Sequence, residues 1–283
     1  MIGNSLKKGI NKGILNWRGV IILWLINFLF SLIFFLPSSS LFSKAFSKSM
    51  ITEKMVKGDL SIFLEFMTVY KNEIGVLFSL SFSLFLIYWI ANLFLSGGII
   101  SILKEESKNV RDIFSYAPNY FWRFIKLSLL FIPFLILFLI IWRILGKLRE
   151  LFFNLTGSEI FTFYFSLLTI FIAILIFLLL RILFDYGRIR VVFEEERFIT
   201  ISLLRTVKFV FKNFWKTFLL YIILTISLLL FYIPIYLVFK IPVFSPILSL
   251  LIFLLSQLLL LFRSFLSFLF YSAQTELYRS LRV

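Results

Sequence analysis

The stretch Ile160–Leu183 reads IFTFYFSLLTIFIAILIFLLLRIL, and Arg181 is the one charged residue among its 24 positions. About 20 consecutive apolar residues are enough for a helix to cross the hydrocarbon core of a bilayer. A segment inside lipid must satisfy its backbone hydrogen bonds internally, which favours a helix over an open strand. This stretch therefore predicts a membrane-spanning helix.

Five further runs of this kind occur along the 283-residue chain. The six predicted spans cover approximately residues 19–37, 75–97, 124–145, 160–183, 217–239 and 246–269. The chain is 61% hydrophobic and 15% charged, whereas soluble domains are about one quarter charged. The first run is long for a signal peptide and lacks a small-residue cleavage site, so it is expected to stay as a span. We therefore expect a single all-α integral membrane domain over residues 1–283.

Lys and Arg gather on alternate connections between the predicted spans. One side of the membrane would carry 20 of the 29 basic residues and the other side nine. Cytoplasmic connections are the ones enriched in Lys and Arg, so this count predicts that both termini are cytoplasmic. The connection at 38–73 weakens the bias, because its five Lys lie on the side predicted to be outside.

A sequence motif recurs along the chain at a shift of 90 residues. Ala91–Glu106 (ANLFLSGGIISILKEE) and Arg181–Glu196 (RILFDYGRIRVVFEEE) are identical at six of sixteen positions, including Gly97/Gly187 and a Glu–Glu pair. A fainter third copy begins at Leu269–Ala273. The first, third and fifth spans each start with Trp and a base, at Trp17–Arg18, Trp122–Arg123 and Trp215–Lys216. The pattern predicts three repeated helical hairpins of one orientation; chance similarity among Phe- and Leu-rich segments is the alternative.

The segments before these three spans are amphipathic. In the third segment, one helical face is apolar and consists of Ile199, Leu203, Val207, Val210 and Phe214. The other face carries Arg205, Lys208, Lys212 and Lys216. A shorter apolar stripe precedes Pro118, which is expected to open the next helix. Such a composition is typical of helices that lie in the headgroup plane, so we expect cytoplasmic interfacial helices that either anchor the protein or recognise lipid or a partner.

Residues that carry chemistry are scarce in this chain. It contains no Cys and no His, which excludes disulfides and removes the commonest metal ligand and general base. No Asp or Glu falls near the middle of a predicted span, and this counts against proton- or cation-coupled transport. A soluble basic domain for nucleic acid would have no room. We therefore expect no enzyme activity, no catalytic residue, no cofactor, no metal site and no nucleic-acid partner.

Four sequence features resemble a broad group of bacterial six-span membrane proteins. They are the Trp–base span starts and the segments Ser96–Ile100, Asp185–Val192 and Tyr271–Tyr278. The group includes the membrane domain fused to some glycerophosphodiester phosphodiesterases, in which catalysis belongs to the soluble domain. The resemblance implies a bacterial or archaeal plasma-membrane protein, and it carries no catalytic residue over to this chain.

The favoured function is that of a non-enzymatic multi-pass membrane protein that acts through its basic interfacial helices. These would bind membrane lipid, with anionic headgroups expected, or a protein partner at the cytoplasmic face. The residues predicted to make the contact are Trp17, Arg18, Trp122, Arg123, Arg205, Lys208, Lys212, Trp215 and Lys216.

Two other functions stay open at this point. The first is a transport component, either a permease subunit or a facilitator, with a path between the hairpins. Its inner mouth would be lined by Asn92, Gly97, Gly98, Arg181, Asp185 and Arg188. The second is a membrane enzyme that acts on a lipid phosphate with Asp185, Glu194 and Arg188, although it lacks a nucleophile.

Overall fold

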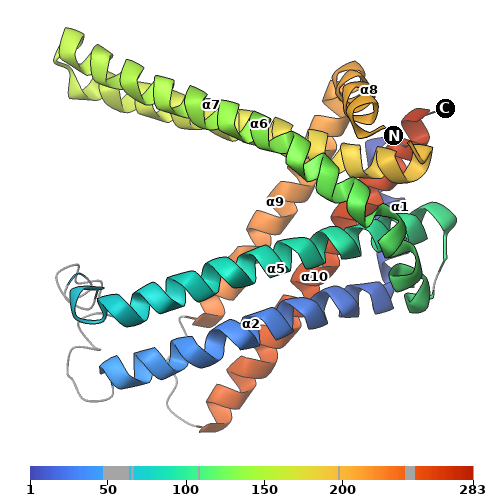
Figure 1. The fold of residues 1–283 in the computed structure, drawn as a ribbon, viewed down its shortest axis with the longest axis horizontal. Coiled ribbons are helices and arrows are strands. Elements are labelled where there is room, and N and C mark those ends of the chain that lie inside the picture. The colour runs from blue at the N-terminus through green and yellow to red at the C-terminus, as the bar shows by residue number, and fades with distance from the viewer. Residues whose placement is uncertain (47–63, 65–66, 108, 197, 240–245, 283) are drawn as a thin grey trace. The chain divides into compact units, whose positions relative to one another are not determined.

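The computed structural model describes residues 1–46, 64, 67–107, 109–196, 198–239 and 246–282. Within these ranges every regular element is a helix (Figure 1). The helices are α1 (Ile2–Leu15), α2 (Trp17–Phe46), α5 (Lys71–Glu105), α6 (Val110–Thr156), α7 (Glu159–Glu194), α8 (Ile199–Lys212), α9 (Phe214–Phe239) and α10 (Pro246–Arg282). Most of the predicted 38–73 connection lies outside the described residues, and so does Lys240.

Six of these helices are long and apolar enough to cross a membrane, which confirms the prediction of an all-α protein with six candidate spans. They are α2, α5, α6, α7, α9 and α10, and each contains one of the predicted runs. At their C-terminal ends, α5, α7 and α10 continue about two turns or more beyond the predicted run. These polar extensions carry the recurring motif, and the functional residues described below lie largely on them.

The expectation that Pro118 opens a new helix is wrong. Helix α6 runs without a break for 47 residues, with both Pro118 and Pro133 inside it, and is about 70 Å long. A proline removes one backbone hydrogen bond and leaves the neighbouring ones in place. On the same stretch of helix, Ile113 and Ala117 are almost completely buried, so tertiary packing holds this turn helical.

The chain divides into two compact units, which are described separately. The larger unit comprises residues Met1–Val20 and Leu93–Val283, and the smaller one comprises Ile21–Asn92. In the smaller unit, the Tyr88 hydroxyl donates to Asn27 Oδ1 at 2.8 Å and joins α5 to α2.

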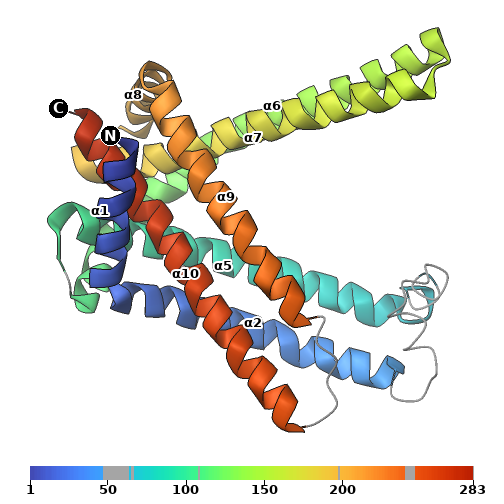
Figure 2. The ribbon, with the colours of Figure 1, turned by 180° about the vertical axis from the view of Figure 1, so that it is seen from behind.

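The core of the larger unit forms where the polar ends of the long helices meet. Fully buried side chains there include Phe124 of α6, Tyr186 of α7, Tyr221 of α9 and Leu277 of α10. Helix α1 packs against α10, as both ribbon views show (Figures 1 and 2). The core therefore lies at the ends of the helices, and much of their remaining length keeps apolar side chains exposed.

Helices α6 and α7 pack along each other as an antiparallel hairpin. The turn is made by Gly157, which has φ +62° and whose N–H donates to the Phe153 carbonyl at 2.8 Å. Glycine adopts this left-handed conformation without strain. The hydroxyl of Ser158 then accepts from the Phe161 N–H and caps the start of α7.

Candidate functional site

A group of ion pairs joins the polar ends of α1, α5 and α10. Lys12 Nζ lies 2.6 Å from Glu276 Oε1 and 3.0 Å from Glu106 Oε1. Arg279 pairs with the same Glu106 carboxylate, and it donates to the carbonyls of Leu103 and Lys104 at 3.1 and 3.0 Å. These carbonyls belong to the last turn of α5, where carbonyl oxygens have no N–H partner within the helix. Arg279 thus caps α5 from a neighbouring helix.

The carboxyl group of Glu106 is held in its charged form. The hydrogen bonds from Arg279 and Lys12 lower its pKa to about 2, from an ordinary 4.5. A lowered pKa means that the group stabilises the fold above its unfolded pKa, and that this contribution is lost as the pH falls toward 2. The side chain is 61% exposed, so solvent screens the pair and its contribution stays below about 1 kcal/mol.

This gives a pH prediction for Glu106→Gln. The variant should unfold at a lower temperature than the unmodified protein at about pH 6, and the difference should vanish at about pH 2. Circular dichroism of both proteins in the same detergent would measure it. A difference that persists undiminished at acid pH would contradict the assignment of the lowered pKa to this carboxyl.

A second ion pair joins α5 to the end of α7. Lys104 Nζ lies 2.6 Å from Glu195 Oε1 and donates to the Val192 carbonyl at 3.2 Å. The hydrogen bond from Lys104 lowers the pKa of the Glu195 carboxyl. Glu195 ends α7 with φ 52°, and Glu106 ends α5 with φ 58°. Both helices therefore stop at a left-handed glutamate, and in both a base from another helix reaches the last carbonyls.

The other acidic residues of this end are also paired. Glu194 lies 3.0 Å from Arg282 and accepts from the Tyr278 hydroxyl at 3.0 Å. Glu196 lies 2.7 Å from Arg205, one of the predicted lipid-contact bases of α8. All three members of the Glu194–Glu196 run thus serve as ion-pair partners between segments of the chain.

A buried ion pair lies deeper in the larger unit. Asp185 and Arg188 are both buried on α7, one turn apart, and form an ion pair. The Arg188 guanidinium lies 4.7 Å from the ring centre of Phe184 and 5.4 Å from that of Tyr271. Arg181, another residue of the predicted inner mouth, is exposed and forms no ion pair with another described residue.

Gly97 and Gly98 of the predicted inner mouth lie at a tight helix crossing. A Cβ on Gly98 would lie 2.2 Å from the backbone carbonyl oxygen of Ile113, and one on Gly97 would lie 3.4 Å from Tyr120 Cβ. Their role in this structure is to let α5 approach α6. Asn92 belongs to the smaller unit and is partly buried on α5.

The three predicted tryptophan anchors are exposed. The exposed fractions are 56% for Trp17, 68% for Trp122 and 77% for Trp215. The guanidinium of Arg18 lies 5.7 Å from the Trp17 ring centre, and Lys216 Nζ lies 3.6 Å from Met1 Sδ. Lys208 and Lys212 are exposed on α8, beside the Arg205–Glu196 pair.

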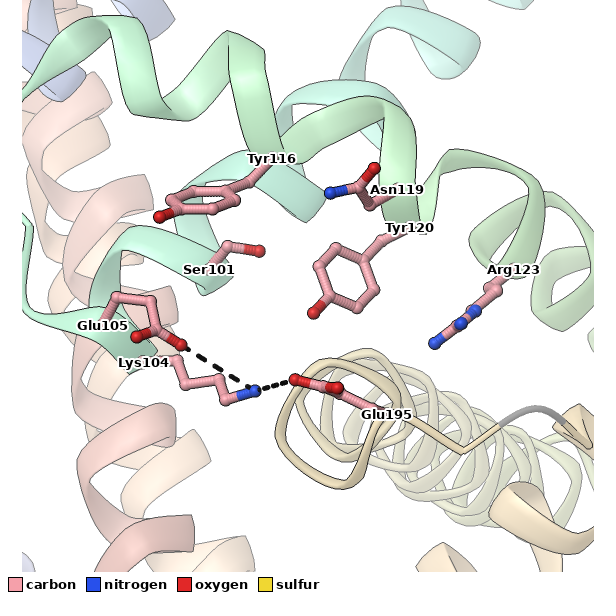
Figure 3. Close-up of a pocket in the computed structure, with 8 residues that line it drawn as sticks. All are labelled: Ser101, Lys104, Glu105, Tyr116, Asn119, Tyr120, Arg123 and Glu195. Atoms are coloured by element: carbon pink, nitrogen blue, oxygen red, sulfur yellow. Dashed lines mark hydrogen bonds and ion pairs between the residues drawn. The ribbon is translucent and has the colours of Figure 1, made fainter.

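A polar pocket of about 310 Å³ lies beside these ion pairs (Figure 3). Its lining comes from the end of α5, the beginning of α6 and the cap of α7, and consists of Ser101, Lys104, Glu105, Tyr116, Asn119, Tyr120, Arg123 and Glu195. The sequence prediction included only Arg123 among these residues. The signal that could have found the others is the Glu–Glu pair of the recurring motif, because it marks both helix ends that border the pocket.

No family model, curated protein or solved structure matches this chain. The resemblance to the bacterial six-span group therefore stays a prediction.

Proposed function

We propose that this protein is a non-enzymatic multi-pass membrane protein that binds anionic lipid through basic interfacial helices. Six helices capable of crossing a membrane support the multi-pass character. The observation that carries the lipid assignment is the outer surface of α8, where exposed apolar and exposed basic side chains lie side by side.

Helix α8 has one face on the protein and another that is free. Ile199, Leu203 and Val210 are buried in the core of the larger unit. These three side chains belong to the apolar face that was expected to enter lipid; they pack inside the protein instead. The exposed apolar side chains are Leu204 (70%), Phe211 (62%) and, just after the helix, Trp215 (77%).

The free surface of α8 fits the boundary between lipid headgroups and acyl chains. At 100° per residue, Leu204 and Phe211 fall within one narrow sector of α8, and Trp215 is exposed at the start of α9. Lys208 and Lys212 border this sector and are exposed. An apolar strip flanked by bases is the arrangement by which helices lie in a membrane surface. Its charge favours phospholipids with a net negative headgroup.

Helix α1 offers a related surface. Its buried side consists of small residues, Ser5, Gly9 and Gly13, which allow close packing against α10. Ile14 and Leu15 are exposed, as are the neighbouring bases Lys7 and Lys8. The exposed Trp17 with Arg18, which follow at the start of α2, extend the same combination of aromatic and basic side chains.

The packing of the recurring motif supports three repeated hairpins. The first copy packs on the start of α6 through Gly98. The second copy packs on α8, where the rings of Tyr186 and Phe209 are 5.8 Å apart. The third returns to α1, where a Cβ on Gly9 would lie 3.0 Å from Ala273 Cα. Each motif thus meets the interfacial segment of the next hairpin in a closed cycle, as an axis near the membrane normal requires.

The same cycle supports a common side for the two termini. Lys12 and Glu276 join α1 directly to α10. With the excess of Lys and Arg on the connections of that side, we infer that both termini are cytoplasmic and that the protein belongs to a bacterial or archaeal plasma membrane. The transport path remains an alternative prediction.

The proposal is tested by removing two bases from the free surface of α8. Lys208→Ala/Lys212→Ala should weaken the binding of phosphatidylglycerol by about 2 kcal/mol, or about thirtyfold, because each base near an anionic surface contributes about 1 kcal/mol. The measurement is the enrichment of phosphatidylglycerol over phosphatidylcholine in the lipid that surrounds the full chain in nanodiscs. High salt should reduce the enrichment.

A matched control removes the same charge elsewhere. Lys147→Ala/Arg149→Ala takes two exposed bases from the far part of α6, on the side predicted to be outside, and should reduce the enrichment less than the α8 variant does. Equal enrichment in the α8 variant and the control would overturn the lipid proposal. If a protein co-purifies in a manner that depends on Lys208 and Lys212 and anionic lipid is not enriched, the partner function replaces it.

A further inference from the structure

We propose that the polar pocket between α5, α6 and the cap of α7 binds the headgroup of a phospholipid that carries both a phosphate and a primary ammonium, the phosphoethanolamine class. This inference rests on the proposed function, because both place this end of the helices at a lipid surface. The inference goes beyond the proposed function by naming a discrete site with its own headgroup selectivity.

The pocket lies at the depth of lipid headgroups. Arg123 follows Trp122, which is 68% exposed, and the predicted span of α6 begins at the next residue. On the opposite wall, Lys104 and Glu105 follow the end of the predicted span of α5. Tryptophan and arginine at a span boundary are typical of the membrane–water interface. At about 310 Å³ the pocket is at the lower end of small-molecule sites, which suits a headgroup rather than acyl chains.

Arg123 is the cation available for a phosphate. Its guanidinium lies 5.7 Å from the ring centre of Tyr120, and it forms no ion pair with another described residue. Figure 3 shows Arg123 and Tyr120 on the same wall, with Asn119 above them. A guanidinium matches the oxygens of a phosphate with two parallel hydrogen bonds. The amide of Asn119 and the hydroxyl of Tyr120 add donors beside it.

The acidic side of the pocket has acceptor capacity left for an ammonium. Glu105 and Glu195 share one base, Lys104, whose Nζ is 3.9 Å from Glu105 and 2.6 Å from Glu195 (Figure 3). Both carboxylates are more than half exposed. A carboxylate can accept about four hydrogen bonds, so Glu105 has room for another donor. A primary ammonium supplies three such donors, whereas a quaternary ammonium supplies none.

The balance of charge excludes the simpler ligands. Two bases and two acids line the pocket, so its net charge is zero. An anion alone would gain the attraction of Arg123 and meet the repulsion of two carboxylates. A headgroup with both charges, aligned from Arg123 to Glu105, is attracted at both ends.

The test is native mass spectrometry of the delipidated full chain, titrated with phosphatidylethanolamine, phosphatidylglycerol and phosphatidylcholine. The unmodified protein should bind phosphatidylethanolamine about tenfold more tightly than the other two at this site. Arg123→Gln should weaken the binding of phosphatidylethanolamine about tenfold, because one charged hydrogen-bond partner is lost. Glu105→Gln should remove the preference for phosphatidylethanolamine over phosphatidylglycerol. Arg111→Gln, an exposed base of α6 outside the pocket lining, is the matched control and should change nothing.

The outcomes separate this site from the surface of α8. Equal binding of the three lipids, or no loss in Arg123→Gln, overturns the pocket assignment. If the pocket assignment fails and Lys208→Ala/Lys212→Ala still loses the enrichment of phosphatidylglycerol, the proposed function holds without the pocket. Soluble glycerophosphoethanolamine binding as tightly as the lipid would overturn the membrane source of the ligand. If none of the lipids binds the protein, both proposals fall.

Discussion

Replacing Gly98 by alanine is expected to destabilise the protein by about 3 kcal/mol, at the upper end of the cost of an overpacked core. The added Cβ would lie 2.2 Å from the carbonyl oxygen of Ile113 and 2.7 Å from its Cγ2. The obstacle is backbone rather than a flexible side chain, so α5 and α6 must separate. Their separation would also widen the pocket that both helices line. Thermal unfolding of the purified protein in detergent measures the loss.

Two other glycines provide the controls for this prediction. Gly146 lies on α6, the helix that Gly98 approaches, and an added Cβ there would have nothing within 4 Å. Gly146→Ala should therefore be neutral or stabilise by up to about 1 kcal/mol, the helix propensity difference between the two residues. Gly97→Ala meets ordinary contacts at 3.4 Å and should be mild. Equal unfolding temperatures for Gly98→Ala and Gly146→Ala would show that the crossing is looser than described.

Replacing Arg188 by methionine is expected to cost about 3–5 kcal/mol, because it leaves a buried carboxylate without its counter-ion. Asp185 is buried beside Arg188, and its further neighbour, Gln274 Nε2, is 3.5 Å away. A neutral amide at this distance does not replace a guanidinium. The loss would appear in the unfolding temperature and as a reduced yield of folded protein in the membrane fraction.

A double variant shows whether the buried charge is the cause. Asp185→Leu/Arg188→Met removes both charges while filling the space, and it should recover most of the stability. If the double variant is as unstable as Arg188→Met alone, the stacking of Arg188 on Phe184 and Tyr271 is the more important contribution. Measuring each single variant and the double variant in one detergent completes the cycle.

Features that depend on a single segment could be predicted from the sequence. The six spans follow from apolar runs such as 160–183, because a chain segment that crosses lipid must be apolar and must satisfy its backbone hydrogen bonds within a helix. The pairing of Asp185 with Arg188 follows from their spacing of one helical turn. The prediction of a helix start at Pro118 was wrong, because the sequence shows the missing N–H and does not show the packing of Ala117 that keeps the turn helical.

Features that join distant segments could not be predicted in the same way. Lys12 belongs to one of the basic segments predicted to lie at the membrane surface, whereas its partners Glu106 and Glu276 are 94 and 264 residues away. Nothing in one sequence selects these two acids among 14. The buried side of α8 was placed toward lipid for the same reason, since an apolar face looks the same whether protein or lipid covers it. The recurring motif was the best guide, because both of its better copies end at the charged site.

The contact between α1 and α10 has a consequence for biosynthesis. Lys12 leaves the ribosome early, whereas its partner Glu276 emerges 264 residues later. Ser272 also donates to the Gly9 carbonyl. The surface of α10 on which α1 packs therefore exists only after α10 has been synthesised. During translation α1 must therefore wait at the bilayer, where its exposed isoleucines and lysines can hold it. Docking of α1 therefore follows the synthesis of α10, and nascent chains stopped before α10 should leave α1 open to added protease.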